Sequence, residues 1–134
     1  MPLVVHTAPL GFDDSDILII SKSHNQKVVA DGWPGGHRGI GLYFSPDGQL
    51  QKLRMQRCGF KLEHETDAQW RKYFDDYVLQ MRQSYRKNRQ AWDTLLSWGR
   101  VVIVSRELEP PRSPRTVLAQ FILPKLGASY AGEL

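Results

Sequence analysis

Residues 101–127 constrain the fold most, because they read as a buried strand, a loop and an amphipathic helix. The strand is a run of β-branched apolar residues, Val-Val-Ile-Val at 101–104, set between Gly-Arg and Ser-Arg. This pattern is typical of a strand buried on both faces, as in a parallel sheet covered by helices. We therefore predict that the 134 residues form a single three-layer α/β domain with a mostly parallel sheet, in which 101–104 is a central strand.

The helix that follows the loop has a defined start and end in the sequence. Ser113 suits the N-cap, and Pro114 suits the first helical position, where its missing N–H group is not needed. Gly127 is a typical residue to end a helix, and Pro124 should kink the last turn. The apolar residues predicted to face the core are Val117, Leu118, Phe121, Ile122 and Leu126.

Arginines gather where this strand ends and this helix begins. A helix N-terminus offers free backbone N–H groups to an anion, and a guanidinium adds a full positive charge with suitable geometry. We therefore predict a phosphate or nucleotide site here. Its residues would be Ser105, Arg106, Arg112, Ser113 and Arg115. In the competing interpretation, Glu107 and Glu109 of the same loop neutralise the arginines.

Two other apolar runs, at residues 3–5 and 17–20, also end in polar residues. Ligands of open α/β sheets bind beyond the carboxyl ends of the strands, so these residues are expected to join Ser105 and Arg106 at one edge of the sheet. They are His6 and Thr7 after the first run, and Ser21, Lys22 and Ser23 after the second. The alternative is that polar residues follow strands simply because loops begin there.

A capping box at Thr66 and Gln69 predicts the start of a long helix that packs on the sheet. Apolar residues recur along it at helical spacing, and they are expected to face the core. They are Trp70, Phe74, Tyr77, Met81, Tyr85, Trp92 and Leu95. A continuous helix to residue 98 would run about 45 Å, too long for this domain, so we expect a break at Asn88.

One flank of this helix is basic, with arginines at positions 71, 82, 86 and 89. The flank could form a surface for a polyanion. Alternatively, its charges are satisfied by ordinary pairs four residues apart. Those pairs would be Arg71 with Asp75, Lys72 with Asp76 and Arg89 with Asp93.

The segment from Asn25 to Lys61 carries weaker signals. Glycines at 35–41 suggest a phosphate loop, but the spacing of known phosphate-binding motifs is absent. Residues 40–44 are expected to form a strand. Residues 50–62 alternate basic and apolar side chains and fit either a strand or a short helix.

Charge and composition limit the classes of function. Residues 1–50 hold 3 basic and 5 acidic groups, whereas residues 51–134 hold 15 and 9, so a basic surface belongs to the second part. The single cysteine, Cys58, excludes an internal disulfide, and the four histidines lack the spacing of metal ligands. With no signal-peptide pattern and no long apolar run, we expect a cytoplasmic protein that does not contact membranes and has no cofactor or metal.

Residues 81–93 read MRQSYRKNRQAWD. They resemble the M-R-x-S-Y-R-x-N-R-x-x-W-D motif of small bacterial and phage α/β proteins grouped as domain-of-unknown-function family 488. In that family the helix leads into a strand ending in Cys-x-Cys and then into Cys-His-Arg at the start of the last helix. These motifs would fall on residues 105–107 and 113–115, where only Arg115 matches. The resemblance thus implies that any thiol or histidine chemistry of the family is lost here.

Three hypotheses of function follow. The first is a binding protein with an anion site for a nucleotide or nucleic-acid phosphate between Ser105 and Arg115. The second is a divergent enzyme that acts on a phosphorylated or nucleotide-like substrate at the same edge, using Ser105, Ser113 or His6. The third is a protein that binds and inhibits a host protein, which the phage membership of the family implies.

Overall fold

The computed structural model describes every residue of the chain except 1, 10, 13, 15, 21–39 and 107–111. Within the described residues, four parallel strands form one sheet in the order β2-β3-β1-β4. The strands are β1 (Val4–Pro9), β2 (Ile17–Ile19), β3 (Arg100–Ser105) and β4 (Ser129–Glu133). β3 lies inside the sheet, so the predicted α/β fold with a central strand at 101–104 is confirmed.

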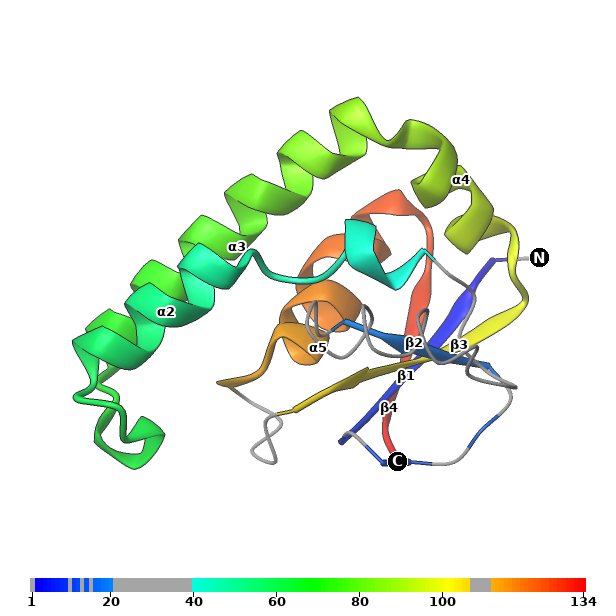
Figure 1. Cartoon of the computed structure of the whole chain (residues 1–134). Coiled ribbons are helices and arrows are strands. Elements are labelled where there is room, and N and C mark those ends of the chain that lie inside the picture. The colour runs from blue at the N-terminus through cyan, green and yellow to red at the C-terminus, as the bar shows by residue number, and fades with distance from the viewer. Residues whose placement is uncertain (1, 10, 13, 15, 21–39, 107–111) are drawn as a thin grey trace, which may run out of the picture.

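The described helices lie together on one side of the sheet (Figure 1). The longer ones are α2 (Gly48–Arg57), α3 (Asp67–Lys87) and α4 (Arg89–Ser97). The last helix consists of α5 (Pro114–Thr116), η4 (Val117–Ile122) and η5 (Leu123–Leu126), which we call together the C-terminal helix. Two short turns, η1 (Gly41–Tyr43) and η2 (Leu62–His64), flank α2 in the chain.

Both faces of the sheet are buried. Val5, Val101 and Ile103 pack with the helices in the larger core, while Val102 and Val104 pack on the opposite face. All four residues of the run at 101–104 are at most 1% exposed. This explains why the run shows no alternation of apolar and polar residues.

The long helix begins and breaks where the sequence predicts. Thr66 accepts a hydrogen bond from the Gln69 backbone N–H at 3.1 Å, and the Gln69 side chain accepts one from the Thr66 backbone N–H at 2.9 Å. α3 ends at Lys87, and α4 starts after Asn88. α3 contacts the C-terminal helix, and the C-terminal helix packs against β1 and β3. α3 is therefore connected to the sheet largely through the C-terminal helix.

Replacing Thr66 with alanine should lower the free energy of unfolding by about 1 kcal/mol, because the Gln69 backbone N–H loses the hydroxyl that accepts its hydrogen bond. Chemical denaturation measures this change. Thr94→Ala is the matched control, since Thr94 is an exposed residue inside α4 and caps nothing. We expect the control to change stability by less than about 0.5 kcal/mol. Equal effects of the two replacements would contradict a capping role.

Residues 41–43 form a 3-10 turn and residues 48–57 form an α-helix, so no strand lies in this part of the described chain. The strand expected at 40–44 is wrong, because Ile40 and Phe44 adopt α-region backbone angles around the turn η1. Of the two structures that fit residues 50–62, the helix is the one observed, as α2. Asp47 caps it by accepting a hydrogen bond from the Gln49 backbone N–H at 2.9 Å.

The C-terminal helix ends at Gly127 as predicted, with the left-handed backbone angle φ of 97°. Its apolar face differs from the prediction. η4 is a wide π-helical turn, followed by a tight 3-10 turn that contains Pro124. A periodicity of 3.6 residues therefore does not apply to this segment. Consequently Phe121, predicted to face the core, is 47% exposed. The apolar residues of this helix at 0% exposure are Val117, Leu118, Ala119 and Leu123.

Candidate functional site

Polar residues from three strands meet at the carboxyl ends of the sheet, but they form an internal network. We call Thr7, Ser105, Arg115, Tyr130 and Glu133 the strand-end cluster. Arg115 is 0% exposed. Its Nε and Nη2 donate to the Glu133 carboxylate at 3.1 and 2.8 Å, and its Nη1 donates to Ser105 Oγ at 2.9 Å. Thr7 Oγ1 lies 2.8 Å from the Tyr130 hydroxyl.

Glu133 supplies the negative charge that Arg115 requires. Burial raises the pKa of this carboxyl, but hydrogen bonds from Arg115 and Thr7 outweigh that effect, and the pKa of Glu133 is lowered overall. The guanidinium is thus neutralised within the protein. The prediction that Arg115 and Ser105 form an open anion site is corrected, because both are buried and Arg115 is held by a carboxylate.

Arg112 and Ser113 are also engaged within the protein. Arg112 donates to the Glu65 backbone oxygen at 2.6 Å and pairs with Asp67 at the start of α3. It therefore connects the C-terminal helix to α3. Ser113 is 0% exposed, and its Oγ lies 3.1 Å from Thr116 Oγ1. As predicted, Ser113 occupies the N-cap position, but its side chain caps no backbone N–H group.

The remaining predicted site residues do not complete such a site. Arg106 is exposed where β3 ends. His6 precedes Thr7 on β1 and, by strand alternation, faces the opposite side of the sheet from Thr7. The expected meeting of His6 with Ser105 is therefore also corrected. Ser21, Lys22 and Ser23 lie outside the described residues, as does the glycine-rich segment at 35–39.

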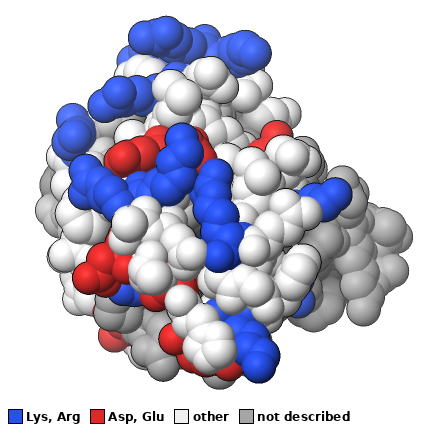
Figure 2. Space-filling view, turned by 90° about the vertical axis from the view of Figure 1, so that its left-hand side faces the viewer, with Lys and Arg blue, Asp and Glu red and all other residues white. Residues whose placement is uncertain are grey.

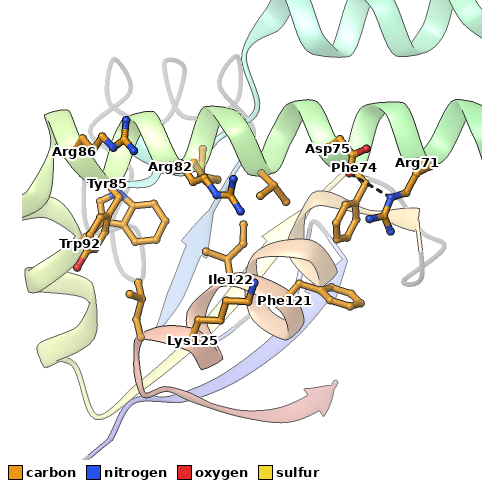
Figure 3. A pocket seen from close by; sticks show the side chains of 13 residues that line it. Arg71, Phe74, Asp75, Arg82, Tyr85, Arg86, Trp92, Phe121, Ile122 and Lys125 are labelled. Carbon is orange, nitrogen blue, oxygen red and sulfur yellow. Dashed lines mark ion pairs between the residues drawn. The ribbon is translucent and has the colours of Figure 1, made fainter.

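A groove of about 610 Å³ lies between α3 and the C-terminal helix, with Trp92 of α4 at one end (Figure 3). Its volume falls within the range of ligand sites. The groove is lined mainly by apolar side chains. These are Phe74, Val78, Met81, Tyr85, Trp92, Phe121, Ile122 and Leu126. Phe121 is thus exposed toward this groove rather than packed in the core.

Aromatic residues stand at both ends of the groove. Phe74 contacts Phe121 edge to face, with ring centroids 5.2 Å apart. At the other end Tyr85 contacts Trp92 in the same way at 5.5 Å. Trp92 is buried, and its indole N–H donates to Ser84 Oγ at 3.1 Å, which fixes the floor there. Between these ends the lining is aliphatic (Figure 3).

Four basic residues border this apolar lining: Arg71, Arg82, Arg86 and Lys125. Arg71 pairs with Asp75 at 3.2 Å. The other three are exposed, and the described part of the chain offers them no ion pair. Arg82 extends from α3 and Lys125 from the C-terminal helix, so cations stand on both walls of the groove (Figure 3).

The pairing predicted along the basic flank of α3 is confirmed, and a role of this flank in binding a polyanion stays a prediction. The predicted pairs of Arg71 with Asp75, Lys72 with Asp76 and Arg89 with Asp93 are present. They satisfy the charges at the two ends of the flank, but not those of Arg82 and Arg86 between them. Figure 2 shows Lys and Arg side chains spread over the face in view, with Asp, Glu and uncharged side chains between them.

No family model, no curated protein and no solved structure matches the chain. The resemblance of residues 81–93 to family 488 therefore stays an expectation.

Other kinds of site are not seen in the described residues. Across those residues, no three His, Cys, Asp or Glu side chains are grouped so that they could hold a metal ion. In the same part of the chain, no helix combines the length and apolar character needed to cross a membrane.

The sequence did not indicate the residues after position 123 that belong to the strand-end cluster and to the groove. Glu133 and Tyr130 lie on β4, whose residues Ser-Tyr-Ala-Gly-Glu carry a weak strand signal. Lys125 follows a proline and reads as an ordinary surface residue at a helix end. The arginines at 82 and 86 were recognisable as a basic flank, but nothing local indicates that Lys125 faces them across a groove.

Proposed function

We propose that this chain is a binding protein whose ligand combines negative charge with an apolar surface, and that it binds in the groove between α3 and the C-terminal helix. The observation that carries the proposal is the pairing of an apolar floor with cations on both walls. Arg82 and Lys125 flank that floor, and neither has a carboxylate partner within the described residues. Anionic groups at the rim would supply the missing partners.

An enzymatic function has less support. The hydroxyl groups that it would use as nucleophiles, Ser105 and Ser113, are 1% and 0% exposed. Ser105 Oγ also accepts a hydrogen bond from the Arg115 guanidinium, an arrangement without the general base that activates a serine.

The proposal predicts that a small aromatic anion binds in the groove. Anilinonaphthalene sulfonate is a suitable probe, since its rings match the floor and its sulfonate matches the rim. Calorimetric titration at low salt should give about three- to tenfold weaker binding for Arg82→Ala and for Lys125→Ala, because each loses one partly hydrated charge-assisted contact. Raising the salt concentration should reduce the difference.

Lys72→Ala is the matched control, because it removes one charge from the same helix but lies outside the groove, where Lys72 pairs with Asp76 at 3.1 Å. Its affinity for the probe should equal that of the wild type. If Arg82→Ala and Lys72→Ala bind equally well, or if the wild type does not bind, the groove is not an anion-binding site.

A further inference from the structure

The groove is long enough for an extended partner rather than a compact one. Its lining on α3 runs from Arg71 to Arg86. Fifteen residues of α-helix at 1.5 Å each span about 22 Å. A partner helix of about four turns has the same length.

The apolar lining follows the whole groove in one stripe. Phe74 and Phe121 form one end, Ile122 lies between, and Trp92 closes the other end (Figure 3). Proteins that bind an amphipathic helix in a groove engage residues at i, i+4, i+7 and i+11 of that helix. A stripe of this length offers room for such a row, with aromatic side chains at the two ends as the larger contacts.

The aromatic rings are poorly placed to stack on nucleic-acid bases. The Arg71 guanidinium lies 4.9 Å from the centroid of the Phe74 ring, and the Arg89 guanidinium lies 4.3 Å from that of Tyr85. Trp92 is 1% exposed. Single-stranded nucleic acids bind through open aromatic faces beside a basic track. Here an arginine lies over one face of Phe74 and of Tyr85, Trp92 is buried, and Phe121 is left as the exposed ring, so the lining favours aliphatic side chains over a row of stacked bases.

The basic residues of the groove indicate which charges a bound partner should carry beside its apolar face. Arg82 and Arg86 stand on the α3 wall, and Lys125 stands on the opposite wall. A helix lying on the floor would therefore meet a cation on each side. We infer that the groove docks an amphipathic helix of another protein, about four turns long, whose apolar face is flanked by Asp or Glu on both sides. This inference rests on the proposed function of the groove.

A designed peptide tests the inference. The probe is a labelled peptide of about sixteen residues with capped ends, leucines at i, i+4, i+7 and i+11, and glutamates beside them. Fluorescence anisotropy against the 134-residue chain at low salt should detect micromolar binding. A scrambled peptide of the same composition should bind at least about tenfold more weakly, because it cannot present one apolar face.

Charge reversal at Arg82 and Lys125 distinguishes a direct contact of these residues with the peptide from an effect on folding. Arg82→Glu and Lys125→Glu should each weaken binding of the acidic peptide by about tenfold, and each should strengthen binding of a second peptide in which lysines replace the glutamates. Lys72→Glu should leave both affinities within about twofold. All three residues are exposed, so the variants are expected to fold. Phe121→Ala should weaken both peptides, since it removes an apolar contact shared by them.

Several outcomes would overturn the inference. Equal binding of the ordered and scrambled peptides would exclude a docked helix, while the proposed function would stand if the aromatic sulfonate still required Arg82. If neither the ordered peptide nor the aromatic sulfonate binds in a way that depends on Arg82, the groove is not a binding site. Tighter binding of single-stranded DNA than of the peptide, lost in Arg82→Glu, would make the groove a nucleic-acid surface. Self-association of the wild type in sedimentation, lost in Arg82→Glu, would make the occupant a second copy of the chain.

Discussion

Glu65→Ala should lower the free energy of unfolding by about 3–5 kcal/mol, because it leaves a buried guanidinium without its carboxylate. Glu65 and Arg54 have side chains only 1% and 2% exposed. Arg54 Nε and Nη2 donate to the two oxygens of Glu65 at 2.8 and 3.1 Å. The guanidinium also lies over the rings of Trp70 and Tyr73, so the pair is enclosed between α2 and α3.

Urea denaturation measures this loss, and two further variants identify its cause. Glu63→Ala removes an exposed carboxylate two residues away and should change stability by less than about 0.5 kcal/mol. The double variant Arg54→Met/Glu65→Leu replaces the pair with apolar side chains and should recover most of the loss. If the double variant is as unstable as Glu65→Ala, the loss comes from packing rather than from an unpaired charge.

The elements that the sequence predicts correctly are those with a local signal. The capping box at Thr66 involves groups three residues apart, and the β-branched run at 101–104 needs only its own composition. Asn88 interrupts the stripe of apolar residues of the long helix, and a helix continuing past it would be longer than a domain of this size. In each case the physical cause lies within one or two turns of chain, so no tertiary information is needed.

The C-terminal helix shows why local patterns fail. Its residues were assigned to faces with a period of 3.6, but the π-helical turn η4 holds more residues per turn. Phe121 therefore leaves the core and joins the groove. The groove itself depends on the C-terminal helix lying beside α3, so that Lys125 and Arg82, far apart in the sequence, line the same groove. No periodicity within either helix encodes that arrangement.

The anion site predicted at Ser113 and Arg115 failed for a related reason. Arg115 does lie at the helix start beside Ser105, as predicted. The partner that satisfies it comes from β4, an edge strand rich in small and polar residues that the sequence pattern does not reveal. The competing interpretation was that carboxylates of the protein neutralise the arginines, and for Arg115 a carboxylate of the protein does so. The carboxylate is Glu133, whereas Glu107 and Glu109 lie outside the described residues.

Glu133→Gln should lower stability at neutral pH by about 3 kcal/mol, toward the lower end of the range for a broken buried pair, because the Glu133 side chain is 24% exposed and water reaches it. The effect should depend on pH. Hydrogen bonds from Arg115 and Thr7 more than offset burial and hold the pKa of Glu133 below its ordinary value of 4.5. A carboxyl with a lowered pKa stabilises the folded state above its unfolded pKa, and this contribution is lost as the pH falls through the folded pKa.

The difference in unfolding free energy between wild type and Glu133→Gln should therefore be complete at pH 7 and shrink below about pH 4.5. Denaturation at several pH values measures it, and Glu63→Gln, at an exposed carboxyl, should stay within about 0.5 kcal/mol of the wild type. A Glu133→Gln variant as stable as the wild type at pH 7 would mean that Glu133 does not neutralise Arg115. Such a result would restore the strand-end cluster as a candidate anion site, since a buried guanidinium must find its negative charge somewhere.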